Sequence, residues 1–318
     1  MLLSVRCQME SRPLARLWGF LYTVWLFTLS DMKTFVFPQT AFGILSALAG
    51  PLLTTNHTPS LELILKRVPL VLLWTWLNTL VFDLANQRRP ESVLEDKLNK
   101  AWRPLPAGRI SEDQTRRLLF VAIPLTLALI HFCIRATEET AILFCLTWMY
   151  NDLGGSDDSF IVRNLVIAVA YTFYGSGALR VTCQPPQCEL NDNATSWLFI
   201  IGCIIFTTMH VQDLKDMAGD RARDRKTAPL VIGETCTRYC IAATILFWSV
   251  VCPWYWQTGL GLWAALVSFG LLVASRAVLL RYQAADVTTW KLWSYWLVSV
   301  YALPGVKHLV ESQTSVLA

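Results

Sequence analysis

Charged residues are scarce in this chain. Asp, Glu, Lys and Arg make up only 16% of its 318 residues, whereas hydrophobic residues make up 54%. Apolar runs recur from one end to the other, so the composition excludes an ordinary soluble domain and indicates a membrane protein with several spans. The net charge of +4 is modest and gives no case for a nucleic-acid partner.

Cysteine spacings typical of zinc or redox sites are also missing. The nine cysteines include neither a CxxC pair nor a Cys/His cluster. Two of them, Cys183 and Cys188, flank a Pro-Pro pair, and they could form a disulfide if that loop faces an oxidising lumen. The N-terminus has no evident small-residue cleavage site after its first apolar run, which disfavours a cleaved signal peptide.

Nine apolar segments are candidate transmembrane helices. They cover 34–53, 66–87, 117–135, 138–152, 161–182, 195–214, 236–256, 259–280 and 288–309. An earlier apolar run, 17–29, is only about thirteen residues long, so we expect it to lie flat on the bilayer surface. The expected fold is therefore all-α and polytopic, with an N-terminal tail and interfacial helix (1–33) followed by a transmembrane domain (34–318).

Lys and Arg concentrate in the loops after the second and sixth spans. The connections 54–60 and 183–195 contain neither residue. By the positive-inside rule, both basic loops face the cytosol, and the sequons at Asn56 and Asn193 fall on the lumenal side. These features predict an integral membrane protein of the endoplasmic reticulum.

The stretch 213–227, DLKDMAGDRARDRKT, places four aspartates in a mostly apolar chain. The offsets between Asp213, Asp216, Asp220 and Asp224 return all four to one stripe of a helix. Like charges at i, i+4 repel by roughly 0.2–0.5 kcal/mol per pair on an isolated helix, so the stripe needs a cationic partner. The alternative is a solvated helix end with internal ion pairs, such as Asp216 with Arg223.

The loop after the second span, FDLANQRRPESVLEDKLNKAWRPLPAGRIS (82–111), also mixes acids with Lys and Arg. Asp83 and Asn86 are i, i+3 neighbours at the end of the span, and Pro90 is expected to end that helix. Further oxygen-bearing side chains follow: Glu91, Glu95, Asp96 and Asn99. Because both loops lie on the same side of the membrane, they can converge.

Two facing loops of this composition suit a diphosphate held through Mg²⁺. Magnesium prefers one or two carboxylates together with waters and phosphate oxygens, and Arg and Lys bind phosphate directly. Neutralising the diphosphate makes it a better leaving group. An isoprenyl tail would rest between the helices, where aromatic faces stabilise an allylic cation and water is excluded.

The stretch DLKDMAGDRARDRKTAPLVIG resembles the second aspartate-rich motif of the UbiA superfamily of intramembrane prenyltransferases, with its DxxDxxGD and KT-P elements. WRPLPAGR resembles the end of that family's first motif, and the layout is similar over nearly the whole chain. The resemblance implies nine transmembrane helices in a UbiA-type bundle, with a central cavity capped by cytosolic loops. It also implies Mg²⁺ as the cofactor and an isoprenyl diphosphate as the substrate.

The first motif departs from the family pattern, in which Asn, Asp and Asp follow at steps of four. Thr79 stands four residues before Asp83, and Gln87 stands four after it, so the second acid is missing from its place. A later acid of the loop could supply it after a local insertion. We favour Glu95 or Asp96, because they closely precede WRPLP.

These patterns and the resemblance together give the candidate site residues. The expected catalytic residues are Asp83, Asp216 and Asp220. The expected metal ligands are Asp83, Asn86, Glu95, Asp96, Asp213, Asp216, Asp220 and Asp224. The expected substrate-binding residues are Asn78, Lys97, Asn99, Arg103, Arg109, Lys215 and Lys226. Tyr171, Tyr174 and the stretch YGSGA (174–178) are expected to serve core packing and a close helix contact.

FDLANQ, EDxxNK and WRPLPAGR look like a fungal branch of the superfamily that is similar to membrane-bound terpene cyclases. The favoured function is therefore ionisation of farnesyl or geranylgeranyl diphosphate followed by intramolecular cyclisation. The alternative is transfer of the isoprenyl group to an aromatic or other lipid-soluble acceptor. A transporter without catalysis is disfavoured, because the acids cluster at one membrane face and not near the midplane.

Overall fold

The computed structural model describes residues 13–183 and 188–317, and every regular element in these ranges is helical. The helices are α1 (Pro13–Thr28), α2 (Phe37–Leu48), α3 (Leu61–Gln87), α4 (Pro90–Asn99), α5 (Glu112–Leu129), α6 (Thr137–Asn151), α7 (Gly155–Asp158), α8 (Phe160–Cys183), α9 (Asp192–Thr208), α10 (Val211–Ala222), α11 (Ala228–Val231), α12 (Glu234–Tyr255), α13 (Leu260–Leu279), α14 (Gln283–Tyr301) and α15 (Leu303–Leu317). Three short π or 3-10 segments accompany them, η1 (Met32–Val36), η2 (Gly50–Leu52) and η3 (Ile130–Ile134). The all-α prediction is confirmed.

Five helical stretches of the described chain are long and apolar enough to cross a membrane. They are α3, α5 continued by η3, α8, α12 and α13. The pair α9 and α10 makes a sixth if it forms one span bent by 46°. The other predicted spans are helical but shorter or less apolar: 34–53 is divided among η1, α2 and η2, α6 has only 15 residues, and α14 mixes Trp, Tyr, Ser and Thr with its apolar residues.

Side-chain caps begin several of these helices where the sequence supplies a suitable residue. Ser60, Ser111 and Asn191 precede α3, α5 and α9, and each accepts a hydrogen bond from a backbone N–H of the first turn. Pro90 opens α4 at its first helical position, where a missing N–H costs nothing. The sharp break between α3 and α4 follows from this local chemistry.

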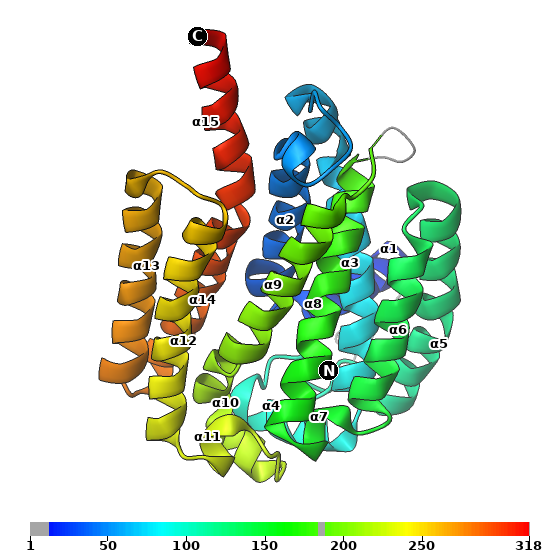
Figure 1. Cartoon of the computed structure of the whole chain (residues 1–318). Helices are drawn as coiled ribbons and strands as arrows, with labels where there is room; N and C mark the ends of the chain where they lie inside the picture. The colour runs from blue at the N-terminus through cyan, green and yellow to red at the C-terminus, as the bar shows by residue number, and fades with distance from the viewer. Residues whose placement is uncertain (1–12, 184–187, 318) are drawn as a thin grey trace, which may run out of the picture.

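The long helices stand side by side, and the two predicted acidic and basic loops meet at the same end of the bundle (Figure 1). Helices α4, α7, α10 and α11 lie together there, and Asn99 Nδ2 of α4 donates to the Asp216 carbonyl of α10 at 3.2 Å. The connections that carry the sequons meet at the opposite end, where Thr54 forms a β-bridge with Leu190. Cys183 and Cys188 are joined by a disulfide at that end, as their spacing allows.

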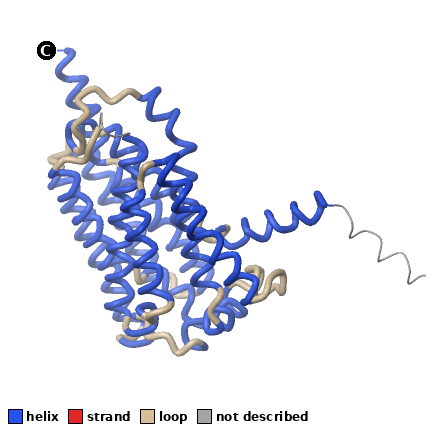
Figure 2. The backbone as a smooth tube through the Cα atoms, turned by 90° about the vertical axis from the view of Figure 1, so that its right-hand side faces the viewer, coloured by secondary structure: helices blue, strands red, loops and turns tan. Residues whose placement is uncertain are grey.

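Helix α1 projects sideways from the bundle (Figure 2). Its apolar side chains are largely uncovered, with Leu14 and Trp18 exposed by 78% and 75%. Its end is fixed to α3, because Gln87 Nε2 donates to the Phe27 carbonyl at 2.8 Å and Trp76 Nε1 donates to Thr28 Oγ1 at 3.0 Å. The position of this helix on a bilayer surface stays a prediction, and exposed apolar residues on a helix that leaves the bundle would favour it.

Buried tryptophans connect neighbouring helices through their ring N–H groups. Trp293 of α14 donates to Thr208 of α9 at 3.1 Å, and Trp296 donates to Ser249 of α12 at 2.9 Å. Both rings are fully buried. Helices that share an apolar environment gain little from hydrophobic burial against each other, so such bonds and close packing hold the bundle together.

The glycines of YGSGA allow the close helix contact that the sequence predicts. A Cβ at Gly175 would lie 2.8 Å from Leu198 of α9, and one at Gly177 would lie 2.3 Å from the ring of Trp74 in α3. On the facing helix α2, a Cβ at Gly43 would lie 2.6 Å from the carbonyl oxygen of Ala178. The absence of side chains at these positions lets α2, α3, α8 and α9 pack closely around the centre of the molecule.

Replacing Gly177 with Ala should destabilise the bundle. The new methyl group would meet Trp74, which cannot move freely because it is buried and donates to Thr140 at 3.1 Å. We expect the free energy of unfolding to fall by about 1–3 kcal/mol, seen as a lower Tm of the purified protein. Gly261→Ala, at an exposed position of α13 with nothing within 4 Å of the new Cβ, is the control and should not lower the Tm. Equal stability of Gly177→Ala and wild type would contradict this packing argument.

Candidate active site

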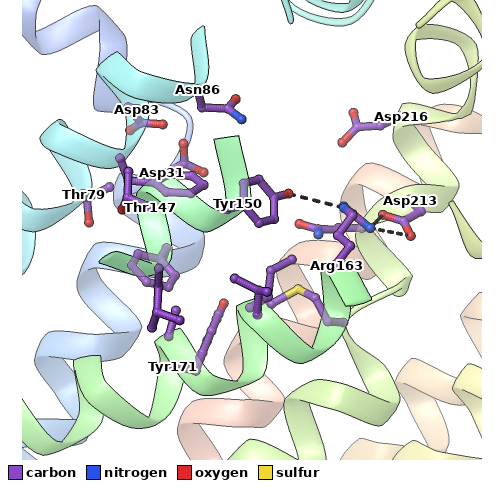
Figure 3. A pocket seen from close by; sticks show the side chains of 18 of the residues that line it. Asp31, Thr79, Asp83, Asn86, Thr147, Tyr150, Arg163, Tyr171, Asp213 and Asp216 are labelled. Atoms are coloured by element: carbon purple, nitrogen blue, oxygen red, sulfur yellow. Dashed lines mark hydrogen bonds and ion pairs between the residues drawn. The ribbon is translucent and has the colours of Figure 1, made fainter. Parts of the chain in front are cut away.

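A cavity lies among α3, α6, α8, α10 and α14, and it is ionic along one part and apolar along another (Figure 3). The charged and amide side chains of its lining are Asp31, Asp83, Asn86, Glu95, Lys100, Arg103, Arg163, Gln212, Asp213, Asp216, Asp220 and Arg225. The apolar and aromatic side chains include Phe35, Phe82, Leu143, Leu146, Val166, Ile167, Tyr171, Tyr174, Met209 and Trp290. One cavity can therefore hold a charged head and an apolar tail together.

The last turns of α3 supply one wall of the ionic part. Asp83 is only 2% exposed, and its Oδ2 is buried with no hydrogen-bond partner among the described residues. Its Oδ1 accepts a long hydrogen bond of 3.4 Å from Gln87 Nε2. Asn86, one turn further on, donates to Asn151 of α6 at 2.9 Å. A buried carboxylate with an unsatisfied oxygen is costly unless a proton or a cation occupies the space beside it.

Helix α10 supplies the opposite wall, and Figure 3 shows Asp213 and Asp216 across the cavity from Asp83 and Asn86. Asp213 forms a buried ion pair with Arg163 of α8 at 2.9 Å, and Asp216 pairs with its neighbour Lys215. The Oδ2 atom of Asp220 is buried and lacks a partner in the part of the chain that the structure describes.

The stripe predicted for four aspartates contains three. Helix α10 ends at Ala222, so Asp224 follows the helix instead of completing the stripe. Asp224 has a left-handed backbone with φ of 57° and is exposed. The prediction that all four share a helical face is wrong at this residue, because α10 ends two residues before it.

Arg103 joins the cavity to the WRPLPAGR segment. Its Nη1 donates to both carboxyl oxygens of Asp96, at 2.9 and 3.0 Å. Burial raises the pKa of Asp96, although the positive charge of Arg103 opposes this. Burial also lowers the pKa of Lys100, and the neighbouring Arg103 charge adds to the effect. Asp96 therefore balances Arg103 and does not line the cavity itself.

A charged network ties α4, α7 and α10 together at this end of the bundle. Asp157 of α7 lies 3.0 Å from Arg89 and 2.9 Å from Arg223, and Glu95 of α4 lies 3.1 Å from Arg223 and 3.4 Å from Arg225. Burial would raise the pKa of Asp157, but the hydrogen bond from Arg223 and the surrounding arginine charges outweigh it and lower the pKa. The network fixes the loops over the cavity relative to one another.

The structure gathers seven of the predicted site residues around the cavity. They are Asp83, Asn86, Glu95, Arg103, Asp213, Asp216 and Asp220. The remaining ones lie outside the lining formed by the described residues, and their roles stay predictions: Asn78, Asp96, Lys97, Asn99, Arg109, Lys215, Asp224 and Lys226. Arg109, for example, stacks over Tyr22 at 4.9 Å and donates to Thr23 of α1 at 3.3 Å.

Sequence reasoning missed four charged residues of the cavity: Asp31, Lys100, Arg163 and Arg225. Arg163 lies within an apolar span, which is itself a signal of a functional or paired group. Tyr171 and Tyr174 were predicted to be ordinary core residues. They are buried, but they also face the cavity, and Phe35 packs edge-on against both rings at 5.0 and 4.7 Å.

The donor set fits a hard divalent cation. No group of three or more His, Cys, Asp or Glu side chains forms a ready metal cluster within 13–183 and 188–317. Unpartnered carboxyl oxygens of Asp83 and Asp220 instead lie on opposite walls. Magnesium commonly takes one or two carboxylates and completes its shell with water and phosphate oxygens. These residues can therefore bind such an ion jointly with a phosphorylated ligand.

The chain is similar to known proteins in both sequence and fold. Residues 45–296 match the UbiA prenyltransferase family. The somaliensene A/B synthase of Streptomyces somaliensis is 29% identical over 88% of this chain and 90% of its own length. The fumagillin beta-trans-bergamotene synthase of Aspergillus fumigatus is 27% identical over 90% of this chain and 92% of its own. A solved structure of digeranylgeranylglyceryl phosphate synthase in membranes superposes with a TM-score of 0.58 at 16% identity, covering 91% and 98% of the two chains.

The Arg163–Asp213 pair should be essential for stability. Arg163→Met keeps much of the side-chain volume but leaves Asp213 as an uncompensated charge that is only 1% exposed. We expect the free energy of unfolding to fall by about 3–5 kcal/mol, measured by thermal unfolding of the purified protein. The double variant Arg163→Met/Asp213→Asn should recover part of this loss, because the buried charge is gone. A double variant no more stable than the single one would exclude charge pairing as the cause.

Proposed function

The chain belongs to the UbiA prenyltransferase family, and from this premise we propose that it is a membrane-bound terpene cyclase. Members of the family are membrane prenyltransferases or terpene cyclases that act on isoprenyl diphosphates. The proposed reaction is Mg²⁺-dependent ionisation of farnesyl or geranylgeranyl diphosphate, followed by intramolecular cyclisation to a terpene hydrocarbon. The proposal rests mainly on one observation: acidic and basic side chains line one part of a cavity, and aromatic and aliphatic side chains line another part of the same cavity.

The acids of the two walls are proposed to hold the metal. Asp83 and Asn86 from α3 and Asp216 and Asp220 from α10 are the central candidates, and Glu95 of α4 also lines the cavity. Magnesium, when bound, would neutralise the diphosphate and make it a better leaving group. Asp213 is less available, because Arg163 already occupies its carboxylate.

The basic side chains of the cavity are proposed to receive the departing diphosphate. Ionisation breaks the bond between the allylic carbon and the bridging oxygen, and the electron pair leaves with the diphosphate. Arg103, Lys100 and Arg225 line the same part of the cavity as the acids. Fixed positive charges at this point stabilise the negative charge that develops on the leaving oxygen. Arg guanidinium groups also match the geometry of phosphate oxygens.

The apolar part of the cavity would hold the isoprenyl tail and the cation. Phe35, Tyr171, Tyr174 and Trp290 present aromatic rings there, and such rings attract a cation placed over their faces. Ring closure uses the double bonds of the substrate itself and ends with loss of a proton from carbon to a basic oxygen. Cyclisation therefore needs no second substrate to accept the isoprenyl group. The somaliensene A/B synthase and the beta-trans-bergamotene synthase, each matched over about nine-tenths of both chains, are enzymes of the terpene-synthase type and favour this outcome.

The proposal includes a membrane placement. We propose that the nine predicted spans form the bundle, that the ionic end faces the cytosol and that the protein resides in the endoplasmic reticulum. The concentration of Lys and Arg in the loops of that end supports this orientation. The catalytic unit is proposed to be 34–318, with one further side chain, Asp31, contributed by the preceding segment.

The second candidate function is transfer of the isoprenyl group to an aromatic or other lipid-soluble acceptor. Membership of the UbiA prenyltransferase family favours this transfer reaction. The same ionisation step would serve both reactions, and only the fate of the cation differs. A transporter is not favoured, because α4 and α10, which carry four acids of the cavity lining, lie at one end of the bundle (Figure 1).

Incubation without an acceptor distinguishes the two functions. Membranes containing the protein are given geranyl, farnesyl or geranylgeranyl diphosphate with Mg²⁺, and the extracts are analysed by gas chromatography and mass spectrometry. We expect a cyclic hydrocarbon from one of the longer two substrates. Product that forms only after an aromatic acceptor is added would reject the cyclase in favour of the transferase.

Removing an acid from either wall should abolish ionisation. We expect Asp83→Ala and Asp216→Ala each to lower diphosphate release by at least about 100-fold, because each removes an anionic ligand from the leaving-group site. Asp158→Asn is the control, since Asp158 is exposed on α7 at the same end and lies outside the cavity lining. Release at the wild-type rate by both Ala variants would argue against either enzymatic reading of this site.

A further inference from the structure

We propose that Asp31 is a metal ligand that acts together with Asp83, and that Gln87 is the positioning residue that holds it there. Asp31 lies between α1 and η1, far along the chain from both aspartate-containing loops. The inference rests on the proposed function, because it assigns a further ligand to the same metal-diphosphate site.

Asp31 lies beside Asp83 at the wall of the cavity (Figure 3). The side chain of Asp31 is 33% exposed, and its Oδ2 accepts a hydrogen bond from Ser30 Oγ at 3.0 Å. The adjacent Asp83 is almost fully buried and has the unpartnered Oδ2 described above. An accessible carboxylate, that of Asp31, and a buried one, that of Asp83, thus lie side by side at the cavity wall.

Two neighbouring carboxylates cannot satisfy each other. Neither offers a donor when ionised, and their charges repel unless a proton or a cation lies between them. The nearest cation, Arg103, is 3.7 Å from Asp31 and is already committed to Asp96 through two hydrogen bonds. One shared guanidinium leaves the pair with surplus negative charge. A divalent cation would remove both the surplus charge and the unsatisfied oxygen.

Gln87 explains why Asp31 is held in this position. Its Nε2 donates to the Phe27 carbonyl at 2.8 Å, and the same nitrogen lies 3.4 Å from Asp83 Oδ1. A single amide therefore joins the end of α1 to the buried acid. Arg103 adds a second link, since its Nη2 donates to Ser30 Oγ at 2.9 Å. An acid at position 87 would lack the donor that makes the bond to Phe27.

The two acids favoured from the sequence are occupied by arginines. Asp96 balances Arg103, and Glu95 accepts from Arg223 at 3.1 Å and lies 3.4 Å from Arg225. Binding a metal through either would require an existing ion pair to break. Asp31 accepts one neutral hydrogen bond, from Ser30, and its ion pair with Arg103 is long at 3.7 Å. Its carboxylate is therefore the stronger candidate to complete the wall that Asp83 begins.

The test measures metal binding directly. Full-length protein in lipid nanodiscs is titrated with Mn²⁺ in the presence of inorganic diphosphate, and free Mn²⁺ is followed by electron paramagnetic resonance. We expect Asp31→Asn to weaken Mn²⁺ binding by at least about tenfold. Gln87→Leu should weaken it as well, by a smaller factor, because both carboxylates remain but their arrangement loosens. Asp158→Asn is the matched control and should bind like wild type.

A charge-only comparison guards against misfolding. Asp31→Glu and Asp31→Gln have side chains of equal length, so Glu should bind Mn²⁺ more tightly than Gln even if both variants are less stable than wild type. Equal affinities for this pair, or wild-type affinity of a folded Asp31→Asn, would overturn the role of Asp31. If Asp216→Ala lost Mn²⁺ binding in that same experiment, the proposed function would stand even though the role of Asp31 had been rejected. If the wild-type protein did not bind Mn²⁺ in the presence of diphosphate, both the role of Asp31 and the proposed function would be rejected.

Discussion

Pairing of buried charges is the constraint on which the rest of this structure depends. The cavity gathers acids and bases inside an otherwise apolar bundle, where an isolated charge would cost several kcal/mol or more. Most of these acids are therefore matched to a basic side chain, as in the Arg163–Asp213 pair, and Asp96 outside the lining is matched to Arg103 in the same way. The pairs also join helices that are distant in the chain. The few oxygens left unmatched are then the ones available to a ligand.

The same pairing separates structural acids from available ones. Asp213 and Asp96 hold helices and loops in place through their arginines. Asp220 also pairs with Arg225, at 3.4 Å through Oδ1, but Asp83 and Asp220 each keep one buried oxygen without a partner among the residues described. Motif membership alone does not make this distinction. It follows from where the arginines lie, and these come from α8, from the segment after α4 and from the segment after α10.

Sequence patterns predicted the helical fold, the meeting of the two charged loops and much of the cavity lining. Asp83 and Asp216 were found because their spacing and composition are local signals. Asp31 could not be found this way, because its proximity to Asp83 depends on how the end of α1 is attached to α3. Asp224 was assigned to the helical stripe because periodicity does not show where a helix stops. Only some of the nine predicted spans are long, unbroken apolar helices, for a related reason: hydropathy does not reveal the breaks that divide 34–53 into three short helical segments.

The tether between α1 and α3 has a practical consequence for biochemical work. A sideways helix with uncovered Leu and Trp side chains depends on its lipid surroundings, and its far end is bonded through Gln87 and Trp76 to the helix that carries Asp83. Detergent that displaces this helix would therefore also displace the side chains of Asp31 and Asp83, because only a few bonds separate them from its attached end. Detergent extracts and reconstituted samples of one preparation would then differ in specific activity although every molecule remained folded.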